Sequence, residues 1–124
     1  MIKVYKCNIL EGLQQLSDRN FQAIAWFEND RGLSSSFIDE VNAIFDDSGL
    51  DYAFNNGETV FGRDADNALR ELDSATNNID EFNQSDKEIF YSKEMQTVRE
   101  MAAKALALVK ASDGLESTVE IIEA

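Results

Sequence analysis

The chain has 124 residues, about the length of one ordinary domain, and its 44% hydrophobic content, with eight Phe, three Tyr and one Trp, favours a folded core over a disordered tail. Its 24 carboxylates outnumber its 11 cations, so the net charge of −13 disfavours direct binding to nucleic acid. The chain has no histidine and one cysteine, which excludes Ser-His and Cys-His catalytic pairs, an HExxH zinc site, a cysteine-cluster zinc site and an internal disulfide.

The amino-terminal segment predicts a strand followed by a short helix. Residues 1–7 alternate weakly and are rich in β-branched and aromatic types, which is typical of a strand, with Cys7 as a small buried side chain in it. Residues 10–17 place leucines three positions apart, which indicates a helical turn. The segment lacks an apolar stretch of signal-peptide length, and nowhere do about 18 apolar residues follow one another, so we expect a cytosolic protein without a membrane span.

Residues 20–28 are ambiguous between strand and helix. Phe21, Ala23, Ala25 and Phe27 alternate as in a strand, whereas Phe21, Ile24, Ala25 and Glu28 would share one helix face. The alternation favours a buried strand. Trp26 lies inside the longest apolar run of this part of the chain and is predicted to belong to the core.

The next segment predicts an acidic helix. Ser36 and Asp39 form a capping-box pattern ahead of apolar residues at helical spacing, and Gly49 is expected to end the helix. Its outward face is predicted to carry Asp39, Glu40, Asp46 and Asp47. The last two would lie at the carboxyl end, where the helix dipole disfavours negative charge, so binding rather than stability would explain their placement.

Residues 50–62 predict a β-hairpin. Asn56-Gly57 can supply the positive φ values of a type I′ turn between the apolar stretches 50–54 and 59–62. Residues 64–82 then predict a helix with an apolar stripe. Asp66, Asp73 and Asp80 recur every seven residues outside that stripe, about 10.5 Å apart along the axis. They form either a solvated polar face or a row of anions that imitates a nucleic-acid backbone.

The carboxyl-terminal part predicts the longest helix and a last strand. Ser85 and Glu88 form a second capping-box pattern, which opens a helix over residues 86–112. Apolar residues at alternating spacings of four and three make this helix either the backbone of the core or the seam of a homodimer, and its alanine content favours the core. Residues 117–124 alternate as a strand. The predicted fold is a single small α+β domain over residues 1–124, with a small sheet from the terminal strands plus a central hairpin, packed by three main helices.

The charge imbalance is concentrated in residues 33–86, which contain 13 carboxylates and only two arginines. The predicted partner-binding residues are acids of this stretch: Asp39, Glu40, Asp46, Asp47, Asp51, Glu58, Asp64, Asp66, Glu71, Asp73, Asp80 and Glu81. Such a field attracts a basic surface, so the sequence predicts a non-enzymatic inhibitor of a basic nucleic-acid-acting protein. Two settings fit equally: a toxin-immunity protein or antitoxin, and a phage or plasmid nucleic-acid mimic with anti-restriction or anti-CRISPR action.

Two alternatives stay open. One is a small carboxylate-based hydrolase, which a close, buried pair of acids in a pocket would favour. The other is an acidic housekeeping or virion component without inhibitory role. No cofactor and no metal are predicted, and the partner is expected to be a basic protein, with no membrane contact and with a homodimer through residues 86–112 left open.

Overall fold

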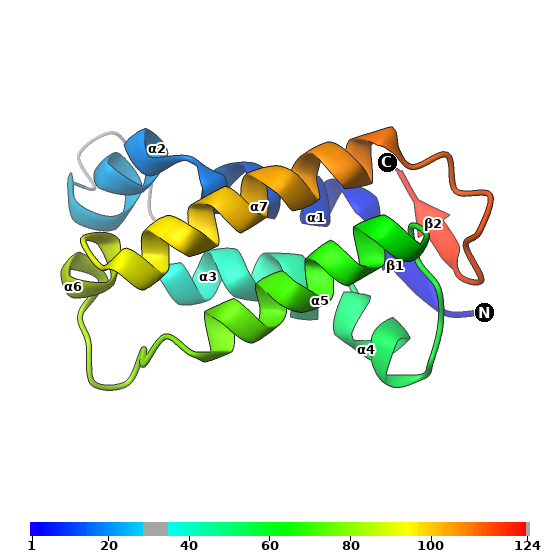
Figure 1. Cartoon of the computed structure of the whole chain (residues 1–124), viewed down its shortest axis with the longest axis horizontal. Helices are drawn as coiled ribbons and strands as arrows, with labels where there is room; N and C mark the ends of the chain where they lie inside the picture. Colours follow the sequence, from blue (N-terminus) through cyan, green and yellow to red (C-terminus); the bar gives the residue numbers. More distant parts are fainter. Residues whose placement is uncertain (29–34, 124) are drawn as a thin grey trace.

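A computed structural model describes residues 1–28 and 35–123 of the chain, which is mostly helical with one small sheet and broadly α+β. The sheet pairs β1 (Lys3–Tyr5) with β2 (Glu120–Ile122) in parallel, with Val4 opposite Ile121. The prediction of two terminal strands is therefore confirmed. This sheet and the amino terminus lie at one end of the molecule (Figure 1).

The prediction of three main helices is not confirmed, because the described residues form seven α-helices and two π-helical turns. Three of these α-helices are longer than ten residues. α7 (Lys93–Ala111) runs along the molecule and packs against both α1 (Lys6–Ser17) and α5 (Arg63–Asn77) (Figure 1). The apolar stripe of α7 is buried from Met95 to Val109. These residues belong to the core, as the alanine content of the helix predicted, since small side chains permit close approach of neighbouring helices.

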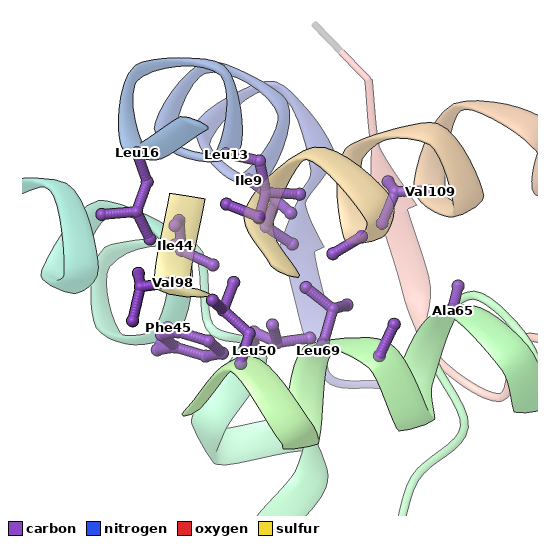
Figure 2. Close-up of a cluster of buried hydrophobic side chains, with 14 of the residues drawn as sticks. Ile9, Leu13, Leu16, Ile44, Phe45, Leu50, Ala65, Leu69, Val98 and Val109 are labelled. Carbon is purple, nitrogen blue, oxygen red and sulfur yellow. The ribbon is translucent and has the colours of Figure 1, made fainter. Parts of the chain in front are cut away.

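The core collects apolar side chains from α1, α5, α7 and the segment between residues 37 and 50. Figure 2 shows Ile9, Leu13 and Leu16 of α1 pointing toward Ile44 and toward Leu69 of α5. Each of these five side chains is fully buried. Burial of apolar area on this scale is the main term that stabilises the fold.

Side-chain caps begin several helices where the sequence predicts them. Ser36 Oγ accepts a hydrogen bond from the backbone N–H of Asp39 and begins α3 (Phe37–Asn42), which continues into the π-helical turn η2 (Ala43–Asp47). Ser85 and Glu88 form the predicted capping box, which begins α6 (Asp86–Phe90). The predicted helix 86–112 is interrupted, because Ser92 caps a new helix there through the N–H of Met95.

The strand predicted for residues 20–28 is wrong. This segment forms α2 (Arg19–Ala23) and the π-helical turn η1 (Ile24–Glu28). Asp18 caps the start of α2 by accepting a hydrogen bond from the N–H of Phe21. This cap favours the helix over the strand for the residues that follow. Trp26 packs against the core from η1, as predicted.

The predicted central hairpin is also wrong. Residues 50–55 form α4 (Leu50–Asn55), and Gly57, with φ of 73°, follows the end of that helix. A glycine with positive φ suits a helix end as well as a hairpin turn, so the local signal was correct and its interpretation was not. The segment after Gly57 contacts the carboxyl-terminal part instead, where the N–H of Thr118 donates to Thr59 O at 2.8 Å.

Cys7 differs from its prediction as well. It lies in α1, not in the strand, and its side chain is exposed.

Over the described ranges 1–28 and 35–123, none of the helices has the length and apolar character needed to cross a membrane.

Candidate acidic binding surface

Four of the predicted acids line one hollow. A cleft of about 160 Å³ lies between the α3–η2 segment and the carboxyl-terminal half of α5. Its acids come from four places in the chain: Asp46 of η2, Asp51 of α4, Asp73 of α5 and Glu81 of the turn after α5. Its apolar wall includes Phe37, Ile38, Val41 and Phe45. The structure therefore joins acids separated by up to 35 positions, Asp46 to Glu81, in one cleft.

Local backbone geometry brings the first two acids together. Ile44 and Phe45 are buried, so the following Asp46 faces outward at the end of η2. Gly49 then adopts φ of 85° and its N–H donates to Asp46 O, which turns the chain directly into α4. Asp51 lies in the first turn of α4, where the helix dipole favours a carboxylate.

Two neighbouring carboxylates act on Asp51 in the cleft. Burial and, to a smaller extent, the charges of Asp73 and Asp46 together raise the pKa of Asp51 from 3.8 to about 6. Burial also raises the pKa of Asp73. Groups that titrate above their ordinary range in a cleft are typical of functional sites, although structural clusters produce the same effect.

No described cation lies within ion-pair distance of these acids. Arg70, one turn before Asp73 on α5, places its guanidinium 4.3 Å from the centre of the Phe54 ring. Within residues 1–28 and 35–123, the one ion pair joins Lys6 to Glu123 near the sheet. The cleft therefore has an anionic character that the fold itself leaves unbalanced.

Six other predicted acids remain accessible around or beyond the cleft. Asp39, Asp47, Asp64, Glu71 and Asp80 are exposed, and Glu58 is half-buried. Glu58 accepts a hydrogen bond from the hydroxyl of Thr118, which ties it to the carboxyl-terminal segment. The accessible acids thus extend from α3 to the turn after α5.

Glu40 does not face outward as predicted. It is 1% exposed, and its Oε2 accepts hydrogen bonds from Trp26 Nε1 at 2.7 Å and Ser35 Oγ at 3.2 Å. Its Oε1 lies 3.2 Å from Gln22 Nε2. Burial raises its pKa to about 7, against the lowering effect of these donors. Its role in this structure is therefore internal, and a partner could not reach it without a change of fold.

A buried polar network extends from Glu40 to α7. Gln22 Nε2 also donates to the backbone oxygens of Gln15 and Leu16, while its Oε1 accepts from Arg99 Nε at 2.8 Å. Arg99 further donates to Phe90 O. Sequence reasoning missed this network because its members lie up to 77 positions apart; a glutamine and an arginine on otherwise apolar helix faces were the available signal.

Asp66 is a second acid that the structure places inside. It is 2% exposed, and its two carboxylate oxygens accept the backbone N–H groups of Val60 and Phe61, each at 2.9 Å. The carboxylate holds the segment that enters α5. Its place in the first turns of a helix after Gly62 was the signal that sequence reasoning overlooked.

The row of three anions, one of the two alternatives for Asp66, Asp73 and Asp80, is not formed. α5 ends at Asn77, so Asp80 belongs to the following turn, while Asp66 is buried at the other end of the helix. Asp80 accepts hydrogen bonds from the N–H groups of Phe82 and Asn83, and the side-chain amide of Asn83 lowers its pKa. Only Asp73 of the three contributes to the cleft.

Among the described residues, no group of three or more acidic or cysteine side chains has the geometry to hold a metal ion.

Comparisons with models of protein families, with curated proteins and with solved structures found no match to this chain. The function must therefore be argued from the geometry of the acidic surface alone.

Proposed function

We propose that this protein is a non-enzymatic inhibitor that binds a basic, nucleic-acid-acting protein through its acidic surface. Asp46, Asp51 and Asp73 are the central residues of that surface, with Glu81 beside them. The partner is a nuclease toxin or another effector whose cleft evolved to hold phosphates. A preorganised anionic surface suits such a cleft because it replaces the phosphates that the cleft normally binds.

One observation carries the proposal: Asp51 and Asp73 are partly buried in the cleft, the charges of Asp73 and Asp46 repel that of Asp51, and no described cation forms an ion pair with these acids. Such an arrangement costs stability in the isolated protein, since the folded state raises the pKa of Asp51 to about 6. A basic side chain from a partner would remove this cost on binding. Electrostatic complementarity of this kind steers association, with rate constants on the order of 10⁸ M⁻¹s⁻¹ at low salt.

Two biological settings remain equally supported. An immunity protein or antitoxin would block a toxin made beside it, whereas a phage or plasmid nucleic-acid mimic would block a restriction or CRISPR effector. Both require the same acidic surface, so the identity of the protein captured from the native host, a toxin or a restriction or CRISPR effector, distinguishes them.

The test of the proposal is the salt dependence of association with the captured partner. Raising NaCl from about 50 to about 500 mM shortens the screening length from above about 10 Å to below about 5 Å, so the association rate should fall sharply. The dissociation rate should change less, because it reports desolvated contacts. An association rate that stays constant with salt contradicts the proposal.

A matched pair of variants locates the binding surface. The cleft variant replaces Asp46, Asp51 and Asp73 with Asn. The control variant removes the same charge from exposed acids outside the acidic middle, by Gln at Glu94, Glu100 and Glu120. The cleft variant should lose about 1 to 3 kcal/mol of binding free energy, because partner cations are left desolvated and unpaired, whereas the control should bind like the parent apart from a small change in rate.

A second candidate, a carboxylate-based hydrolase, has one observation in its favour. Asp51 and Asp73 lie in the same cleft, and a carboxyl whose pKa is about 6 can serve as a general acid or base near neutral pH. Hydrolase assays on phosphate-ester and glycoside substrates, with and without Mg²⁺, test it. Turnover that persists through repurification and disappears in Asp51→Asn would favour the enzyme over the inhibitor.

A further inference from the structure

Phe82 is an apolar side chain displayed beside the acidic cleft. It is 89% exposed, the most exposed aromatic residue among those the structure describes. An aromatic side chain exposes a large apolar area, which water solvates poorly and a partner can bury. Buried aromatic anchors dominate the binding energy of many protein interfaces.

The turn that carries Phe82 is held by hydrogen bonds of its own. Asp80 Oδ1 accepts from the N–H groups of Phe82 at 3.2 Å and Asn83 at 3.1 Å, and Oδ2 accepts from Asn83 Nδ2 at 2.8 Å. These bonds fix the backbone on both sides of the exposed ring. Ordering this turn on binding therefore loses little conformational entropy, which favours its use as an anchor.

Phe82 also lies next to the cleft. A second hollow, of about 360 Å³, is lined by residues 76–82. It shares Thr76, Asn77 and Glu81 with the acidic cleft, so the two hollows have a common wall. Glu81 lines both hollows and directly precedes Phe82, so a partner that contacts Glu81 in the cleft lies close to the ring of Phe82.

We infer that this protein binds its partner at two adjoining points, a basic side chain in the acidic cleft and an apolar or aromatic side chain against Phe82. The inference rests on the proposed function and adds the chemistry of the partner surface, which must carry an apolar group next to a cation. A protein surface offers that combination. A nucleic acid could stack a base on Phe82, but its phosphates would meet Asp73, Asp80 and Glu81.

The probes for this inference are two synthetic peptides of equal length and charge, one alternating Arg with Ala and the other alternating Arg with Trp. Isothermal titration at low salt gives both affinities, and amide shifts of residues 76–83 locate the contact. The parent protein should bind the Arg-Trp peptide about fivefold to tenfold more tightly. Phe82→Ala should remove this preference. Tyr52→Ala is the matched control, because Tyr52 is 64% exposed and lines neither hollow.

The outcomes separate the inference from the proposed function. Equal affinity for the two peptides, or a preference that survives Phe82→Ala, overturns the inference. If Asp51→Asn and Asp73→Asn still weaken both peptides in that case, the proposed function stands; if they change neither affinity, the proposed function fails. Binding of an oligothymidine that depends on Phe82 also overturns the inference, since it would assign the ring to nucleic acid.

Discussion

Trp26 donates a hydrogen bond of 2.7 Å from its indole Nε1 to Oε2 of Glu40, which lies 14 positions further along the chain. The contact joins η1 to α3 inside a buried network that reaches Arg99 on α7. Trp26 is the one tryptophan of the sequence, so its fluorescence reports the state of this carboxyl. The ionisation of Glu40 and the stability of the fold can therefore be measured independently.

Acidification should stabilise this protein. Burial raises the folded-state pKa of Glu40 from 4.5 to about 7 and that of Asp51 from 3.8 to about 6. The folded state therefore binds protons more tightly than the unfolded chain, and this contribution is complete below about pH 4 and is lost as the pH rises through 6 to 7. For Glu40 it is on the order of 3 kcal/mol. The melting temperature at pH 5 should exceed that at pH 8 by several degrees.

Glu40→Gln is the control for this pH dependence. The variant cannot ionise, so its melting temperature should change less between pH 5 and 8, and the fluorescence of Trp26 should lose its titration near pH 7. The general repulsion of a chain with net charge −13 acts in the same direction but is screened by salt, whereas the buried group is screened much less. A pH slope that vanishes entirely at high salt would contradict the role of Glu40.

Asp66 and Asp64 form a matched pair on α5. Asp66 is buried and accepts two backbone N–H groups, whereas Asp64 is exposed. Asp66→Asn presents an NH₂ group to one of these donors and should cost about 2 to 3 kcal/mol. Asp64→Asn should change the free energy of unfolding by less than about 0.5 kcal/mol. Urea unfolding of both variants measures the difference, and equal effects would contradict a structural role of Asp66.

Local signals predicted the parts of the fold that depend on local interactions. Ser36 and Ser85 cap helices as expected because a serine before a helix satisfies N–H groups three residues on, wherever the helix lies. Gly57 was misjudged because a positive φ fits both a hairpin turn and a helix end. The helix is favoured over the hairpin because it buries Leu50 and Ala53 in the core. A local sequence pattern carries no information on that tertiary contact.

The candidate site was predicted only as a region of charge. The acids of the cleft were all in the predicted set, but the sequence could not group Asp46, Asp51 and Asp73, since tertiary packing brings η2, α4 and α5 together. It also counted Glu40 and Asp66 as surface acids. A carboxylate is seldom buried without hydrogen-bond donors. For Glu40 a donor is Trp26, 14 positions away, and for Asp66 the donors are backbone N–H groups, so no sequence pattern revealed either.

Gly49, before α4, and Gly57, after it, differ in how closely another part of the backbone approaches them. Both have positive φ, 85° and 73°, so Ala is strained at either position by about 1 kcal/mol. A Cβ at Gly49 would lie 2.7 Å from Lys3 O, whereas nothing lies within 4 Å of one at Gly57. Gly49→Ala should therefore lower the melting temperature well beyond Gly57→Ala. Similar melting temperatures would show that β1 can move away from this turn.

The negative charge of the cleft should lower the stability of the isolated protein. Replacing Asp46, Asp51 and Asp73 with Asn removes mutual repulsion, and the raised pKa of Asp51 means that its charged form costs stability at pH 7. The variant should melt at a higher temperature than the parent at pH 7.5, and the gain should shrink at pH 5, where Asp51 already holds its proton in the folded state. Neutralising exposed acids on α7 should give a smaller gain without this pH dependence. A cleft variant that melts lower than the parent would mean that these carboxylates support the fold, and an acidic surface kept for a partner would no longer explain them.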